Sequence, residues 1–151
     1  MNLQEAKLLA ELWLEHHDLK DWKIAFDKAK LRFGKCVYRE KIIYLSQYLV
    51  LLNAEKDVEE TILHEIAHAL VGQGQGHNYI WRAKANAIGC SSNRCFSAEI
   101  VQPQGKYKAV CNTCGAVSHK HRMPRKKIAC IKCCKQYNYG RFSDKYLFLY
   151  R

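Results

Sequence analysis

Two histidines and a glutamate lie close together in the stretch His64-Glu65-Ile66-Ala67-His68. On a helix, side chains four residues apart point the same way, about one turn apart, so both imidazoles can reach one metal ion. Glu65 lies beside them, where it can contact a metal-bound water without being a ligand. The alternative is a buried helix that carries these groups by coincidence. Because polar groups in so apolar a segment are costly to bury unsatisfied, the pattern favours zinc, with Glu65 as the catalytic residue.

A catalytic zinc usually takes three protein ligands and leaves a fourth position for water. His77 directly follows the glycine-rich stretch 72–76, which lets the chain turn back, so His77 is the predicted third ligand. Such a zinc lowers the pKa of its water to about 7, and Glu65 would take the water's proton and return it to the departing amine. These residues predict peptide hydrolysis, and the sequence assigns no residue to stabilise the oxyanion. The rival third ligands are the other histidines (His16, His17, His119 and His121).

Two Cys-x-x-Cys pairs predict a second, structural zinc site. Fifteen residues separate the pair Cys111 and Cys114 from the pair Cys130 and Cys133. Four thiolates close the coordination shell, so this zinc leaves no position for water and is not catalytic. Two alternatives stay open: Cys134 in place of Cys133, and His119 or His121 in place of a cysteine.

The net charge of +11 comes entirely from the C-terminal part of the chain. Residues 1–100 hold 13 basic and 13 acidic residues, whereas residues 101–151 hold 12 basic residues and a single acid, Asp144. A zinc held by four thiolates would lower the net charge to about +9. This imbalance predicts DNA as a partner, single-stranded or junction DNA included. The basic residues around the cysteines are the predicted contacts (Lys120, Arg122, Arg125, Lys126, Lys127, Lys132 and Lys135). The interleaved aromatic rings either stack on bases or pack a small core (Tyr107, Tyr137, Tyr139 and Phe142).

The elements that must position these residues indicate an α+β fold. Apolar spacing predicts a first helix over 2–17, and three segments rich in β-forming residues predict a small antiparallel sheet (22–26, 30–38 and 41–46). Residues 47–53 fit a short helix or a strand extension. Asp57, followed three residues later by Glu60, is predicted to cap the start of the helix that carries His64. Gly72 is predicted to end this helix.

The remaining chain predicts a further helix, a linker and a small zinc module. The helix is expected from His77 or Asn78 to Ile88, the irregular linker over 90–106, and short strands with cysteine knuckles from Tyr107 onward. No apolar run approaches the ~20 residues of a membrane span, and the N-terminus lacks the apolar stretch of a signal peptide. We therefore expect a soluble monomer without membrane contact, located in the cytoplasm and associated with the nucleoid, or in the nucleus of a eukaryote.

In combination, these motifs resemble the SprT-like family, which includes the eukaryotic protease Spartan. The resemblance runs from about Leu19 to Cys133 and rests on ordered pieces rather than on one motif (His64-Glu65-x-x-His68, Gly76-His77 with Trp81, Ile88-Gly89, Arg32-x-Gly34-x-Cys36, Ile42-Ile43-x-Leu45-Ser46 and the C-terminal ribbon). It implies a zincin-like metallopeptidase domain over 1–105, followed by a basic zinc ribbon over 106–151. It also implies His64, His68 and His77 on the catalytic zinc, and proteolysis of proteins crosslinked to DNA.

Two other functions fit the same residues. One is a nucleic-acid-binding protein whose His64–His68 zinc is structural rather than catalytic, although a structural site has no need of Glu65. The other is a peptidase for a specific protein partner, without dependence on DNA.

Overall fold

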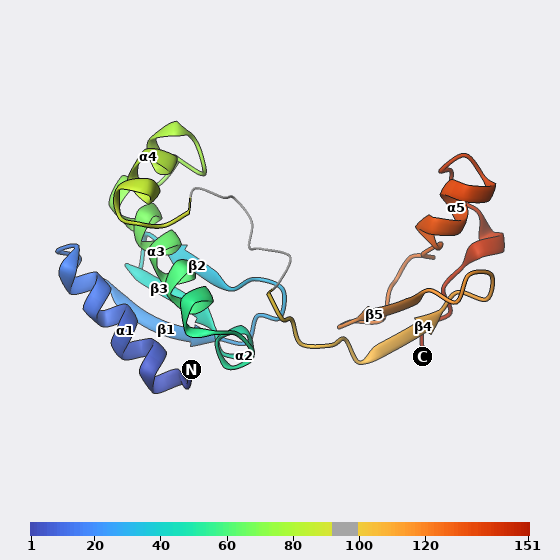
Figure 1. Cartoon of the computed structure of the whole chain (residues 1–151), viewed down its shortest axis with the longest axis horizontal. Coiled ribbons are helices and arrows are strands. Elements are labelled where there is room, and N and C mark those ends of the chain that lie inside the picture. Colours follow the sequence, from blue (N-terminus) through green and yellow to red (C-terminus); the bar gives the residue numbers. More distant parts are fainter. Residues whose placement is uncertain (92–99) are drawn as a thin grey trace. The chain divides into compact units, whose positions relative to one another are not determined.

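The computed structural model describes residues 1–91 and 100–151, and these form two compact units, Met1–Pro103 and Gln104–Arg151 (Figure 1). Part of the linker predicted over 90–106 lies outside the described residues, at 92–99. Within the described part of the chain, no helix is long and apolar enough to cross a membrane.

The first unit begins with helix α1, Leu3–His16, close to the predicted range. Asn2 caps it: its side chain accepts a hydrogen bond from the backbone N–H of Glu5, and the Glu5 carboxylate accepts one from the backbone N–H of Asn2. This reciprocal pair satisfies two backbone donors that the first turn would otherwise leave open. Ala6, Ala10 and Leu14 form the buried face of the helix.

Three short strands form a mixed sheet: β1 (Lys23–Asp27), β2 (Gly34–Val37) and β3 (Ile42–Ser46). Their order is β1-β3-β2, with β3 antiparallel to β2 but parallel to β1. The prediction of a wholly antiparallel sheet is therefore wrong for β1. β2 and β3 form a hairpin, and this hairpin places β3 rather than β2 beside β1. Composition marks which residues form strands, but it does not fix their neighbours.

Two helices follow the sheet directly. α2 (Gln47–Leu52) begins at Ser46, whose side chain accepts from the backbone N–H of Leu49, so the 47–53 segment is a helix. α3 (Glu55–Val71) ends at Gly72, as predicted, where a φ of 83° favours glycine. The predicted cap at Asp57 is wrong, because α3 begins two residues earlier, at Glu55, and its N-cap residue is Ala54, which makes no side-chain cap. Asp57 lies in the first turn instead, where its negative charge suits the positive end of the helix dipole.

The core of the first unit lies where α1 and α3 pack against each other and against the sheet. Its central residues are fully buried (Phe33, Ile43, Leu45, Val50, Val58, Ile62 and Ile66). α4 (Tyr79–Ala87), capped by the Asn78 side chain, packs against α3 through a second cluster that includes Trp81 and Ala85. α3, which carries His64 and His68, is therefore packed against α1, α4 and the sheet.

The second unit is a small module built around cysteines. β4 (Tyr107–Val110) and β5 (Val117–Lys120) form an antiparallel hairpin, followed by α5 (Ile131–Tyr137) and a short 3₁₀ turn, η1 (Asp144–Tyr146). The chain end is part of this module, because Lys108 and Arg151 exchange both backbone hydrogen bonds. Strands and knuckles are present as predicted, whereas α5 was not predicted. The buried centre consists of four cysteines and one tyrosine (Cys111, Cys130, Cys133, Cys134 and Tyr146).

Candidate metal centres

Three histidine side chains converge in the first unit. His64 and His68 come from one face of α3, and the turn after Gly72 brings His77 back to them. The Nε2 atom of His77 lies 3.0 Å from Nε2 of His64 and 3.1 Å from Nε2 of His68. The structure thus brings together the three histidines that the spacing selected.

This geometry fits a zinc ion. Zn–N bonds of about 2.0–2.1 Å in a tetrahedral shell place neighbouring nitrogens about 3.3–3.4 Å apart. The nitrogens here are slightly closer, and all three lie within 4.8 Å of one another. Three imidazoles leave a fourth position of the shell open, which is the arrangement of catalytic rather than structural zinc sites.

His64 and His68 are also in the protonation state that a metal requires. Burial, together with the neighbouring histidines, lowers the pKa of His64 and of His68 to about 4. Both imidazoles are therefore neutral at pH 7. A neutral nitrogen can bind zinc without first releasing a proton.

Trp81 packs against all three rings. Its ring centroid lies 4.6 Å from that of His64, 5.1 Å from that of His68 and 4.5 Å from that of His77. Trp81 itself is fully buried in the cluster between α3 and α4. Since aromatic contacts at these distances restrict ring rotation, Trp81 fixes the orientation of the three imidazoles. The sequence showed Trp81 only as part of a family pattern and gave no sign of this contact.

Glu65 follows His64 on α3 and is 6% exposed. Burial raises the pKa of its carboxyl to about 7, although the positive charge of Arg32 and the backbone N–H of Cys36 act in the opposite direction. Both opposing groups belong to the segment around β2, so the carboxyl lies between α3 and this strand. A carboxyl with a pKa near 7 can accept and release a proton at neutral pH.

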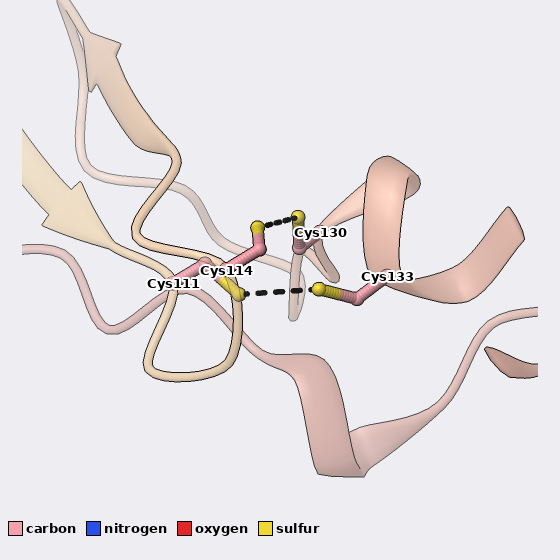
Figure 2. Close-up of side chains that lie close together, drawn as sticks. All are labelled: Cys111, Cys114, Cys130 and Cys133. Atoms are coloured by element: carbon pink, nitrogen blue, oxygen red, sulfur yellow. Dashed lines mark hydrogen bonds between the residues drawn. The ribbon is translucent and has the colours of Figure 1, made fainter. Parts of the chain in front are cut away.

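Four cysteines converge in the second unit (Figure 2). Cys111 and Cys114 come from the turn after β4, Cys130 caps the start of α5, and Cys133 lies in the first turn of that helix. The Sγ atoms of Cys111 and Cys133 lie 3.7 Å apart, and those of Cys114 and Cys130 lie 3.6 Å apart. These cysteines are not disulfide-bonded. Zn–S bonds of about 2.3 Å in a tetrahedral shell place sulfurs about 3.8 Å apart, so the site fits zinc closely.

The local backbone also favours a thiolate at Cys111. Gly115, with a φ of 70°, closes the turn between Cys111 and β5, and its N–H donates to the carbonyl of Cys111. Backbone N–H groups of Cys114 and Thr113 lower the pKa of Cys111 to about 6, against the effect of burial. Such backbone N–H groups stabilise a sulfur in its charged form, which is the form that binds metal. The module fits a zinc ribbon in its cysteine spacing and in its geometry.

The residues that were alternatives lie elsewhere. Cys134 is buried beside the centre but is not one of the four converging cysteines. His119 contacts Gln104 and the carbonyl of Gly105. In the first unit, His16 and His17 pack against Trp13. Among the described residues, none of these histidines belongs to a converging group.

All seven predicted DNA contacts are exposed on the second unit. Lys120 ends β5, Lys132 and Lys135 lie on α5, and the other four lie on the connection between these elements. Among the described residues, Lys127 is the one member of this set that forms an ion pair, with Asp144 at 2.6 Å. Three of the four aromatic rings are also largely exposed, Tyr139 almost completely at 97% (Tyr137, Tyr139 and Phe142). Packing of a small core therefore does not explain Tyr139 and Phe142, whereas the ring of Tyr137 lies 5.9 Å from that of the buried Tyr146.

The fold and the two residue clusters define a class of protein: an α+β domain with three converging histidines that could hold a metal ion, joined to a module whose four cysteines fit a zinc ribbon. Comparison with known proteins gives the family. The model of the SprT-like family matches residues 5–101. Protein SprT of Vibrio parahaemolyticus serotype O3:K6 (strain RIMD 2210633) is 29% identical over 120 residues, which cover 74% of this chain and 73% of that protein. The chain belongs to the SprT-like family.

Proposed function

We propose that the chain is a zinc-dependent endopeptidase that cleaves proteins associated with DNA, DNA–protein crosslinks included. The convergence of His64, His68 and His77, with the buried Glu65 on the same helix, is the observation that carries this proposal. Membership of the SprT-like family supports it. In this proposal the first unit is a zincin-like catalytic domain, and the second is a ribbon that binds nucleic acid.

In this proposal, the metal and the protein each supply a part of the chemistry. The three histidines would hold zinc, which supplies a Lewis acid that polarises a carbonyl and lowers the pKa of water. Glu65 accepts a proton from the attacking water as its oxygen bonds to the carbonyl carbon. When the C–N bond breaks, Glu65 returns that proton to the amine nitrogen, and the products are a carboxylate and an amine. A pKa near 7 suits both directions of this transfer.

The ribbon would direct this activity to DNA. Its exposed lysines and arginines can neutralise phosphates, and its exposed rings can stack on unpaired bases. The four cysteines would hold a structural zinc that keeps the module folded. Because phosphate contacts release bound counterions, the affinity for DNA should fall steeply as salt increases.

The test measures cleavage of a DNA-bound protein, with and without DNA, and DNA affinity over a series of salt concentrations. The double variant Arg125→Glu, Lys126→Glu should lose most of the DNA affinity and the DNA-dependent part of the activity. Lys28→Glu, Lys56→Glu is the matched control, because it makes the same charge change at exposed sites of the first unit. Equal cleavage with and without DNA would indicate a peptidase for a protein partner. DNA binding without any cleavage would indicate a structural histidine centre.

A further inference from the structure

Gly34 begins strand β2 directly beside the side chain of Glu65. A Cβ atom at Gly34 would lie 2.6 Å from Oε1, 2.7 Å from Cγ and 3.0 Å from Cδ of Glu65. Separations below 3.0 Å essentially never occur for a real Cβ, so no residue larger than glycine fits while Glu65 keeps this position. We propose that Gly34 is a positioning residue: its missing side chain is what admits the Glu65 carboxylate between α3 and β2.

The backbone at Gly34 does not itself need glycine. Six other described glycines have a positive φ, whereas Gly34 does not, so an L-residue could adopt its conformation. It lies in a regular strand, paired with Leu45 of β3. Space for Glu65 is therefore the reason for a glycine here.

The strand cannot move away to make room for a side chain. β2 pairs with β3 over four residues, and the N–H of Ser46 donates to the carbonyl of Phe33, immediately before Gly34. Phe33 is fully buried in the core. On the other side, α3 is held by α1 and α4. With both backbones fixed, the flexible end of Glu65 is the part that must yield.

An alanine at position 34 would therefore displace the carboxylate and leave the zinc ligands in place. Oε1 would have to recede by about 0.8 Å to reach ordinary van der Waals contact. Misplacement of a reacting group by about 1 Å can cost about 100-fold in rate. This step rests on the proposed peptidase function, in which Glu65 is the base.

The first experiment compares Gly34→Ala with the neighbouring variant Lys35→Ala, an exposed position on the same strand. We expect Gly34→Ala to lower kcat by about 10- to 100-fold, with zinc content and KM unchanged. Lys35→Ala should leave kcat, KM and zinc content unchanged. An unchanged kcat in Gly34→Ala would contradict the proposal, as would a loss of zinc equal to the loss of activity.

The second experiment needs no activity. The melting temperature of the zinc-loaded chain is measured for Gly34→Ala in the wild type and in Glu65→Ala, where the space is free. We expect the alanine to raise the melting temperature in Glu65→Ala and to lower it, or raise it less, in the wild type. Equal changes in both backgrounds would overturn the proposal. If this coupling is present but no variant cleaves protein, the proposed function fails and the contact between Gly34 and Glu65 stands.

Discussion

Acidification offers a quantitative test of the three-histidine centre. An imidazole must lose its proton to bind zinc, so metal affinity falls once the pH drops below its pKa. For two ordinary histidines with a pKa of about 6.5, protonation at pH 5 would lower the affinity by about 1,000-fold. His64 and His68 have pKa values near 4 in the folded chain. Their protonation should therefore cost less than about twofold at pH 5, and become severe only below about pH 4.

Tryptophan fluorescence provides the assay, because Trp13, Trp22 and Trp81 all lie in the first unit and Trp81 contacts the three rings. The metal-free chain is titrated with zinc at pH values from 7.5 to 4. His16→Ala, His17→Ala is the matched control, because these histidines lie outside the centre; its fluorescence will differ because both contact Trp13, but its zinc affinity at each pH should match that of the wild type. A fall of about 1,000-fold or more in affinity between pH 7.5 and pH 5 would refute the reasoning, since it would mean that the site does not hold its histidines neutral.

Two further predictions concern the ribbon. A Cβ at Gly105 would lie 2.4 Å from the carbonyl carbon of Lys120, a backbone atom that cannot rotate away, so Gly105→Ala should destabilise the second unit by about 1–3 kcal/mol. Chemical denaturation checks this, and unchanged stability would contradict it. Cys133→Ser should release the ribbon zinc, whereas Cys134→Ser should retain it, because only Cys133 belongs to the converging four. Zinc content per chain distinguishes them, and the reverse result would assign the fourth position to Cys134.

Local patterns predicted the elements that carry the candidate sites. Apolar spacing and Gly72 located α3 and its end, and residue spacing alone selected the groups that the structure brings together. These features depend on residues that are close together in the sequence, or on metal coordination, in which few residue types can serve as ligands. The start of α3 was misplaced because the true cap position, Ala54, carries no capping side chain.

Contacts between distant segments could not be predicted. The position of β3 between β1 and β2 depends on packing over the whole unit, so composition gave the strands without their order. For the same reason, the roles of Trp81 and Gly34 became visible only once α4 and β2 were placed against α3. Neither residue has a chemical group that would mark it as part of a catalytic site. Trp81 contributes by packing against the imidazole rings, and Gly34 by leaving space for Glu65. A sequence pattern does not show either contact.

The most direct test of the central claim is Glu65→Gln, which keeps the shape of the side chain and removes its ability to accept a proton. Cleavage of a DNA-bound protein is measured for the wild type and the variant, with zinc content determined in the same samples. We predict equal zinc in both and a loss of cleavage of at least about 100-fold in the variant. Cleavage at the wild-type rate by zinc-loaded Glu65→Gln would contradict the account, because Glu65 would then not be the base.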